Sequence, residues 1–215
     1  MRGIKFDNIH SFYDLNLVLS TVTIPPAKVK TSYVDIAGAD SSLDLTEALG
    51  EVRYKDKDLK FTFTVHPDDK LTWEEKISQV ANAISGKRCK VTLDRDSAYY
   101  WDARCVVSDN KKKGKIKQIT VTATAKPYKL KQNATVAVFA LSETVQAVTL
   151  RNDRKSVVPK ITCTNENTVV VFNGNSYTLG AGEHKVLDIC FKQGDNILMI
   201  SGNGKITFTY QEGAL

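Results

Sequence analysis

The sequence predicts a mainly β protein with one helix, on three observations. Runs of alternating apolar and polar residues recur along most of the 215 residues, which is the period of a half-buried strand. From about Lys131 onward the strands are short, are separated by Gly and Asn turns, and include no helix. One stretch alone shows the 3.6-residue apolar period of a helix, carried by Trp73, Ile77, Val80, Ala81 and Ile84. We therefore expect a β-sandwich-like N-terminal domain (residues 1–130) packed by a single helix, followed by a C-terminal β-sandwich (residues 131–215).

The first strands follow one another closely. Ile4 and Phe6 alternate with a lysine, the pair Asp7-Asn8 turns the chain, and residues 15–19 alternate again as a second strand. Two prolines end that strand, since proline cannot donate to a ladder. An extended run over residues 29–36 leads to a polar loop that includes Gly38, Ala39 and Asp40. Residues 59–65 then form the cleanest strand of this half, with one apolar and one polar face.

The helix has start and stop signals at both ends. Thr72 and Glu75 have the spacing of a capping box, in which the hydroxyl and the carboxylate bond to each other's backbone N–H groups. Gly86 supplies a left-handed stop. A strand over residues 89–93 follows at once, so the apolar face of the helix has a sheet to cover.

A long hairpin completes the N-terminal half. Tyr99 and Trp101 share parity with the apolar residues of the strand that follows, which leaves Tyr100 as the more exposed of the three aromatic residues. The lysine-rich stretch around Gly114 has the composition of a hairpin tip, and residues 119–125 form the returning strand.

The C-terminal half reads as a series of short strands. The strongest turn signal is Asn173-Gly174, because both residues tolerate the positive φ of a tight hairpin. Regular strands with this turn spacing predict a small β-sandwich. The expected strands cover residues 136–139, 145–150, 158–164, 168–172, 176–179, 185–191, 197–200 and 206–210.

Composition narrows the function classes. The balance of 30 basic and 24 acidic residues, a net charge of +6, gives only weak support to nucleic-acid binding. Because the apolar runs are far shorter than the ~20 residues of a membrane helix, we expect a soluble protein without membrane contact. The cysteines are widely spaced, with no C-x-x-C, which predicts reduced and mostly buried thiols. Cys89 and Cys105 have the parity of core positions on adjacent strands.

The residue types that carry catalysis do not assemble into a recognisable pattern. His10, His66 and His184 lie beside predicted turns, and none has a nucleophile setting such as G-x-S-x-G. The acidic pairs Asp68-Asp69 and Asp94-Asp96 also fall at turns, where Asp accepts backbone hydrogen bonds. No Walker loop, Rossmann glycine pattern or H-E-x-x-H motif occurs. We expect no enzyme, no cofactor and no metal site.

Two surface features are candidates for interfaces. The hairpin tip carries Lys111, Lys112, Lys113 and Lys115, which could contact phosphates but lack the interleaved aromatics and arginines of a nucleic-acid site. A solvated tip is the favoured interpretation. Tyr100 could serve as a sugar-stacking platform or as an interface anchor.

In its order of short segments, the chain resembles the distal tail protein of long-tailed phages that infect Gram-positive bacteria. The resemblance spans nearly the whole chain, and spacing rather than any single motif carries it. The loop at Gly38 departs from the family's Pro-Gly-Arg-Asp-Gly pattern and has no arginine. The matching segments are Phe6-Asp7, residues 34–46, the helix ending at Gly86, Val91 to Asp94, Tyr99 to Trp101 with Arg104, Ala125 to Lys129, Asn152 with Pro159, Gly194 to Ile197, and Tyr210 to Gly213.

The resemblance implies a structural hub. Such a protein forms a hexameric ring at the distal end of the tail of the virion, is synthesised in the cytoplasm of the bacterial host, and lets DNA pass through the lumen. Its N-terminal domains build the ring and its C-terminal domains are galectin-like sandwiches. The implied partners are the major tail tube protein and the tail-associated baseplate hub protein. We expect copies to meet at residues 37–46, which include the polar loop with Gly38, Ala39 and Asp40, and at the lysine tip, residues 111–117.

A carbohydrate-binding module for recognition of the host cell wall is the alternative. It follows from the galectin-like sandwich, and its candidate sugar platforms are the aromatics Phe172, Tyr177, Phe191, Phe208 and Tyr210.

Overall fold

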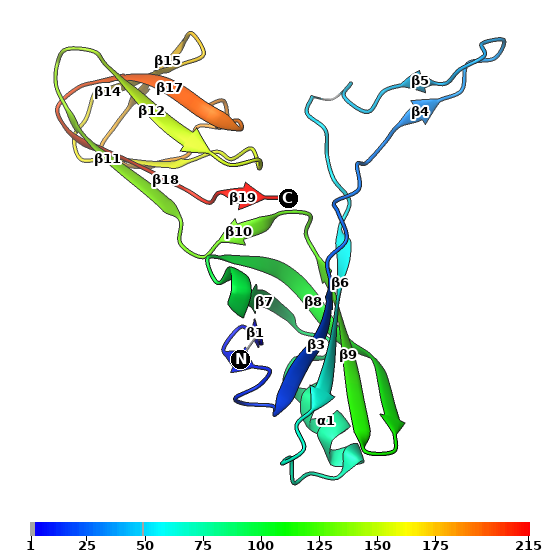
Figure 1. Cartoon of the computed structure of the whole chain (residues 1–215). Helices are drawn as coiled ribbons and strands as arrows, with labels where there is room; N and C mark the ends of the chain where they lie inside the picture. Colours follow the sequence, from blue (N-terminus) through cyan, green and yellow to red (C-terminus); the bar gives the residue numbers. More distant parts are fainter. Residues whose placement is uncertain (1–2, 49) are drawn as a thin grey trace. The chain divides into compact units, whose positions relative to one another are not determined.

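The computed structural model describes residues 3–48 and 50–215, which are mainly strands with one α-helix (Figure 1), so the predicted fold class is confirmed. The described chain divides into two compact units, Met1–Lys129 and Leu130–Leu215.

The first unit is built on one antiparallel sheet with the order β2-β1-β7-β8-β9-β6-β3. The expected turn at Asp7-Asn8 is present, with Asp7 at a positive φ of 50°, but it joins β1 to the short strand β2 rather than to the second predicted strand. That second strand is β3, which pairs with β6 at the other edge of the sheet. The strands are β1 (Ile4–Phe6), β2 (Ile9–His10), β3 (Leu17–Thr23), β6 (Lys57–Val65), β7 (Arg88–Leu93), β8 (Tyr99–Lys113) and β9 (Ile116–Ala125).

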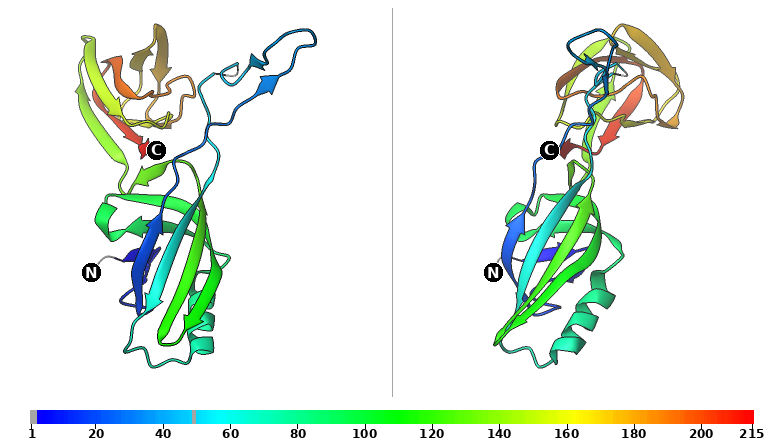
Figure 2. Two further views of the ribbon diagram at one scale, coloured as in Figure 1. Left: turned by 45° about the vertical axis from the view of Figure 1, so that its right-hand side comes forward. Right: turned by 90° about the vertical axis from the view of Figure 1, so that its right-hand side faces the viewer.

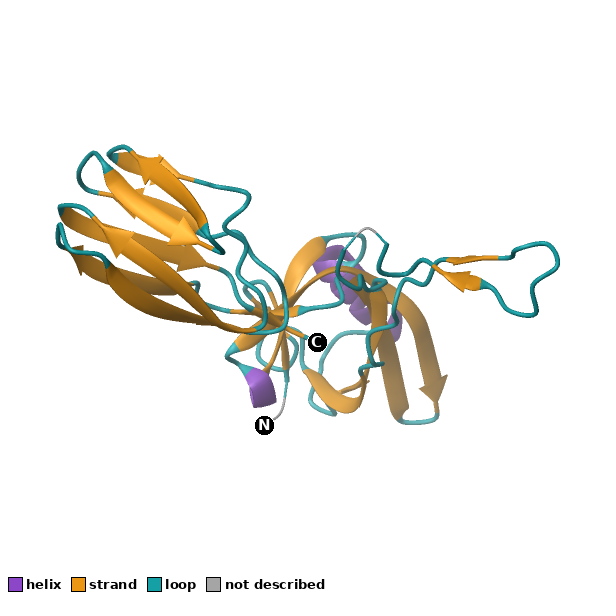
Figure 3. Cartoon of the chain, turned by 90° about the horizontal axis from the view of Figure 1, so that it is seen from above, coloured by secondary structure: helices purple, strands orange, loops and turns teal. Residues whose placement is uncertain are grey.

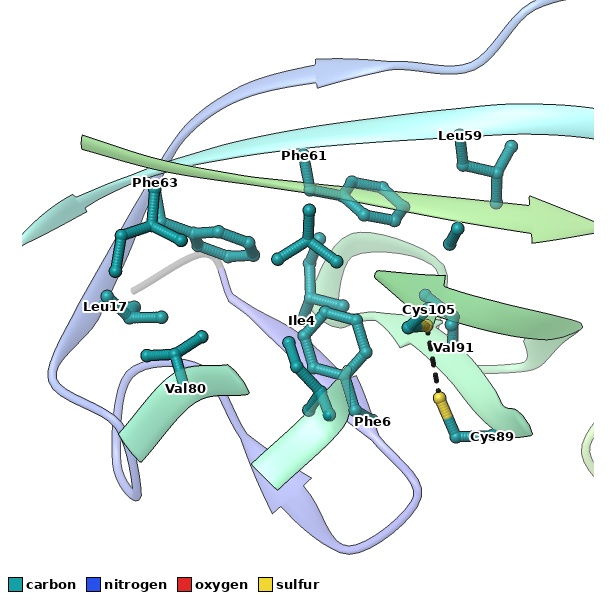
Figure 4. Packing of buried hydrophobic residues seen from close by; sticks show 14 of the residues in the cluster. Ile4, Phe6, Leu17, Leu59, Phe61, Phe63, Val80, Cys89, Val91 and Cys105 are labelled. Atoms are coloured by element: carbon teal, nitrogen blue, oxygen red, sulfur yellow. Dashed lines mark hydrogen bonds between the residues drawn. The ribbon is translucent and has the colours of Figure 1, made fainter. Parts of the chain in front are cut away.

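Helix α1 (Trp73–Ile84) lies against this sheet (Figure 2). The predicted capping box is confirmed: the Glu75 N–H donates to the Thr72 hydroxyl, and the Thr72 N–H donates to the Glu75 carboxylate at 2.9 Å. Gly86 follows the helix at φ 77°. In Figure 4, Val80 of the helix points toward Phe63 and Leu17, so the helix supplies one wall of the core.

The core of the first unit combines the helix with the inner faces of its strands. The Phe6 ring meets the rings of Phe61 and Phe63 edge to face, with centroids 6.5 and 6.4 Å apart. Alternation along β6 is strict, and its inward residues are buried while Lys60 and its other outward neighbours are not. The cleanest predicted strand is therefore confirmed as a half-buried strand of this sheet.

A lysine occupies a core-facing position on the helix, which periodicity alone did not predict. Lys76 is 1% exposed, and its Nζ lies 2.6 Å from Oδ2 of Asp69, which is 4% exposed. Gln79 Oε1 accepts a second bond from Nζ at 2.9 Å. Asp69 therefore does more than close a turn, because it neutralises a charge that the helix buries.

The second unit consists of two four-stranded sheets, β11-β18-β13-β16 and β12-β17-β14-β15, whose stacked layers are visible in Figure 3. Their inward residues form a separate core around Phe191 and Phe208. The strands are β11 (Thr135–Leu141), β12 (Gln146–Asn152), β13 (Lys160–Cys163), β14 (Thr168–Phe172), β15 (Asn175–Leu179), β16 (Gly182–His184), β17 (Gly194–Ser201) and β18 (Gly204–Tyr210). The short strands β10 (Lys129–Lys131) and β19 (Gly213–Ala214) pair with each other and belong to neither of these sheets.

One predicted strand of this unit is wrong and one predicted turn is confirmed. Asn173 and Gly174 join β14 to β15 with φ values of 49° and 81°. Residues 185–191, expected as a strand, are irregular apart from a bridge between Val157 and Phe191. Their apolar residues entered the alternation pattern because Ile189 and Phe191 are fully buried, but the backbone there turns instead of pairing.

We expect Trp73→Ala to lower the free energy of unfolding by about 3 to 5 kcal/mol, because the indole is 8% exposed and belongs to the core cluster. Urea denaturation would measure the change. Ser78→Ala, on the exposed side of the same helix, is the matched control and should change stability by less than about 0.5 kcal/mol. A loss below about 1 kcal/mol for Trp73→Ala would mean that the helix does not cover the sheet.

The buried ion pair predicts a pH-dependent stability. Burial alone would raise the pKa of Asp69, but bonds from the Lys76 ammonium and the Leu71 N–H outweigh it and hold that pKa below its ordinary value. The pair's contribution is therefore present at neutral pH and is lost as pH falls through the lowered pKa.

Lys76→Met should cost about 3 to 5 kcal/mol at neutral pH, because it strands a buried carboxylate. The loss should shrink when unfolding is measured near pH 4, where Asp69 takes up a proton in the variant. Asp69→Asn in the Lys76→Met background is the control and should restore part of the stability at neutral pH. An equal loss at both pH values would argue against a buried charge as the cause.

Candidate assembly surfaces

Between β3 and β6, residues 28–48 and 50–55 form a thin hairpin, here termed the hairpin arm. Its strands β4 (Tyr33–Val34) and β5 (Leu43–Asp44) pair only with each other, and Figure 3 shows no other strand beside them. Further bonds within the arm run from the Lys30 N–H to the Arg53 carbonyl and from the Lys55 N–H to the Lys28 carbonyl, both 2.8 Å. These backbone N–H and C=O groups of the arm are therefore bonded to partners within the arm.

The two faces of the hairpin arm differ in character. Val34 lies opposite Leu43 on one face, and Ile36 and Leu45, just outside the two strands, add further exposed apolar side chains. These side chains are 38 to 50% exposed. The opposite face carries Tyr33 opposite Asp44 and the Ser42 hydroxyl, which donates to Asp35.

We expect another surface to bury the exposed apolar residues of the hairpin arm. An isolated two-stranded hairpin is marginally stable in water, and contiguous exposed apolar residues mark interaction surfaces. The described part of the first unit does not cover this face, since none of its four apolar residues belongs to the core cluster. The alternation within residues 33–36 and 43–45 was the sequence signal for this surface, and the predicted contact segment, residues 37–46, includes the second of these two stretches.

The predicted loop residues form the tip of the arm. Gly38 has φ 85°, and the Ala39 N–H donates to the Ile36 carbonyl at 3.1 Å, which closes a tight turn. Gly38, Ala39 and Asp40 are all exposed. The positive φ explains a glycine at position 38, because a side chain there would be strained. Any contact of these residues with another copy stays a prediction.

The lysine tip is the end of the hairpin that β8 and β9 form. Lys112 lies opposite Lys117, an arrangement of like charges that costs stability, and Gly114 turns the chain at φ 60°. Lys111 is paired with Asp109 at 3.0 Å. The remaining predicted residues, Lys113 and Lys115, are exposed. Positive charge is thus concentrated at the tip of the β8–β9 hairpin, in a different segment of the chain from the arm.

Tyr100 is half-buried instead of being the exposed member of its group. Lys90 Nζ lies 4.8 Å from the centre of its ring, and both border a surface hollow of about 350 Å³. Arg88 binds Asp102 in the same hollow with two bonds of 2.6 Å, which lower the pKa of Asp102 to about 2. Trp101 is buried as predicted.

The histidines do not form a catalytic group among the described residues. His10 Nε2 lies 3.2 Å from Asp94, and its Nδ1 accepts the Phe12 N–H at 3.1 Å, so this ring holds a loop in place. His66 borders Asp68, and His184 Nε2 bonds to the Gly180 carbonyl at 2.8 Å. Within residues 3–48 and 50–215, no three His, Cys, Asp or Glu side chains lie together as a metal site would require.

The aromatic residues considered as sugar platforms belong mostly to the core of the second unit. Phe191 and Phe208 are fully buried, and Phe172 and Tyr210 are each 4% exposed. Tyr177 is half-buried against the same core. Four of these five rings are therefore closed to a stacking ligand. Among the described residues, no helix is long and apolar enough to cross a membrane.

No protein-family model and no curated protein matches the sequence. Among solved structures, the chain is similar to the Dit protein (gp 19.1) of SPP1, described as a paradigm of the hub adsorption apparatus in phages that infect Gram-positive bacteria. The TM-score is 0.72, the alignment covers 100% of both chains, and 10% of the residues are identical. The resemblance inferred from the sequence is therefore confirmed in the fold.

Proposed function

We propose that this chain is a structural hub protein of a phage tail tip, located at the distal end of the tail in the virion. In this role it forms a ring, hexameric as the resemblance implies, that joins the tail tube to the tail-associated adhesion hub. The full-length similarity to the SPP1 Dit fold supports the assignment to the tail tip. The exposed apolar face of the hairpin arm is the observation that supports assembly of several copies.

The arm suits contacts between copies for a physical reason. Its apolar residues are too few and too exposed to stabilise the chain that carries them, so their burial contributes only when another surface covers them. A second copy of the chain is the occupant that a closed ring requires, because each subunit of a ring presents one surface and receives the next. The polar face, with Asp35 and Ser42 bonded to each other, can remain in water.

The other partners follow from the same role. The major tail tube protein and the tail-associated baseplate hub protein would dock on opposite sides of the ring, and DNA would pass through the lumen without a specific site. The lysine tip fits a contact with an acidic surface of one of these proteins. Synthesis in the bacterial cytoplasm is consistent with the free cysteines of the chain.

The carbohydrate-binding alternative draws no support from the second unit. Sugar platforms need an aromatic face open to solvent, whereas the rings of this unit pack against one another. Enzymatic activity likewise has no observation in its favour, since none of the histidines is positioned beside a nucleophile. The role of a structural hub is the one that the exposed surfaces and the fold support together.

The test removes the apolar face of the arm without touching either core. Val34→Ser combined with Leu43→Ser should shift the full-length protein from rings to monomers, weakening association at least tenfold, because both side chains are about half exposed and opposite each other. Native mass spectrometry and negative-stain electron microscopy at low micromolar concentration would measure the change.

Tyr33→Ser is the matched control, since Tyr33 is also a large exposed residue but points to the other face of the same hairpin. It should leave assembly intact. The thermal midpoint of the monomeric unit should not change in either variant. A wild-type protein that stays monomeric under these conditions would contradict the proposal of a ring.

A further inference from the structure

Cys89 on β7 and Cys105 on β8 face each other inside the first unit. The strand register places Cys89 opposite Ala103, so Cys105 lies two residues further along β8 and on the same side of the sheet. Their sulfur atoms are 3.3 Å apart, and Figure 4 shows the two side chains pointing toward one another. Both are free thiols. Two thiols this close can form a disulfide within the chain, which a lone cysteine cannot do.

The two thiols differ in access. Cys105 is fully buried, whereas Cys89 is 7% exposed and borders two surface hollows, of about 240 and 350 Å³. One hollow is also lined by Ile84 and Lys87, and the other by Tyr100. A small reagent can therefore approach Cys89 from the surface, while Cys105 is reachable only through Cys89.

The difference in access sets the order in which the two thiols react. The sulfur atoms share one hydrogen bond, in which either can be the donor. Because the attacking thiolate must reach the reagent, Cys89, which borders the surface hollows, is the attacking sulfur, and the buried Cys105 reacts second.

We propose that Cys89 and Cys105 form an oxidisable dithiol, which a low-molecular-weight disulfide such as oxidised glutathione converts into a disulfide between β7 and β8. The Cys89 thiolate attacks one sulfur of the reagent, breaks its S–S bond and releases one free thiol. Cys105 then loses its proton, attacks the Cys89 sulfur of the mixed disulfide and releases the second thiol. The protein loses two electrons and two protons, and the reagent takes up both as two thiols.

The geometry requires a small movement. The sulfur atoms must close from 3.3 Å to the roughly 2.0 Å of a disulfide. The Cys105 backbone is held where the chain leaves α1, by the Gly86 N–H at 2.7 Å and the Lys87 carbonyl at 2.9 Å. The bond would tie β7 to the neighbouring strand β8.

The experiment incubates the full-length native protein with oxidised glutathione, blocks remaining thiols and maps the cysteines by mass spectrometry. The wild-type protein should lose about 2 Da, retain two of its four free thiols, and yield a Cys89–Cys105 cross-linked peptide. Its thermal midpoint should rise by roughly 5 °C, and dithiothreitol should reverse the rise.

Variants separate the two steps. Cys105→Ala should stop at the mixed disulfide and retain one glutathione on Cys89, and in Cys89→Ala the buried Cys105 thiol should stay unreacted. Cys163→Ala is the matched control, since Cys163 is a buried thiol of the second unit and its removal should leave the cross-link unchanged. Four unreacted thiols in the wild-type protein, or a cross-link that involves Cys190, would overturn the proposal. The wild-type measurement decides the matter even if a variant does not fold.

Discussion

Burial of the inner face of the first unit's sheet is the constraint on which the rest of this structure depends. The inward residues of β6 pack against Phe6 of β1, whose ring centroid lies 6.5 and 6.4 Å from those of Phe61 and Phe63, and α1 closes another side of the same core. This requirement fits the strength of the helix signals, because Trp73 and Val80 of the capped helix are buried in that core. It also explains why Lys76 needs Asp69: the helix buries this lysine as well, and its charge must be neutralised.

The sequence allowed prediction of what depends on short-range rules. The capping box, the stop at Gly86 and the Asn173-Gly174 hairpin are each determined by neighbours along the chain, and all three are present. Sheet order was not predictable, since β3 and β1 have the same alternation but belong at different places in the sheet. Alternation also failed at residues 185–191, because buried side chains alternate there without a partner strand. The ion pair at Lys76 escaped prediction since its two members meet only through the loop before the helix.

Buried polar anchors account for segments that carried the resemblance. The Asn152 amide donates to the Phe191 carbonyl at 3.2 Å, and the Asn196 amide donates to the Leu150 carbonyl, also at 3.2 Å. Glu212, 4% exposed, accepts bonds from the Lys131 ammonium and from the Asp153 N–H. A replacement at any of these positions would leave buried polar groups unpaired.

The separation of core from arm has a consequence for assembly. Each unit buries its own apolar residues, so folding of the subunit does not require a ring. The apolar face around Val34 and Leu43 contributes to neither core, and its burial is therefore available as free energy of association. A bond between Cys89 and Cys105 would affect the stability of the first unit and not its association, because it would join β7 to β8 without reaching the arm. A subunit arranged in this way can be stabilised by oxidation while the contacts that join it to its neighbours stay unchanged.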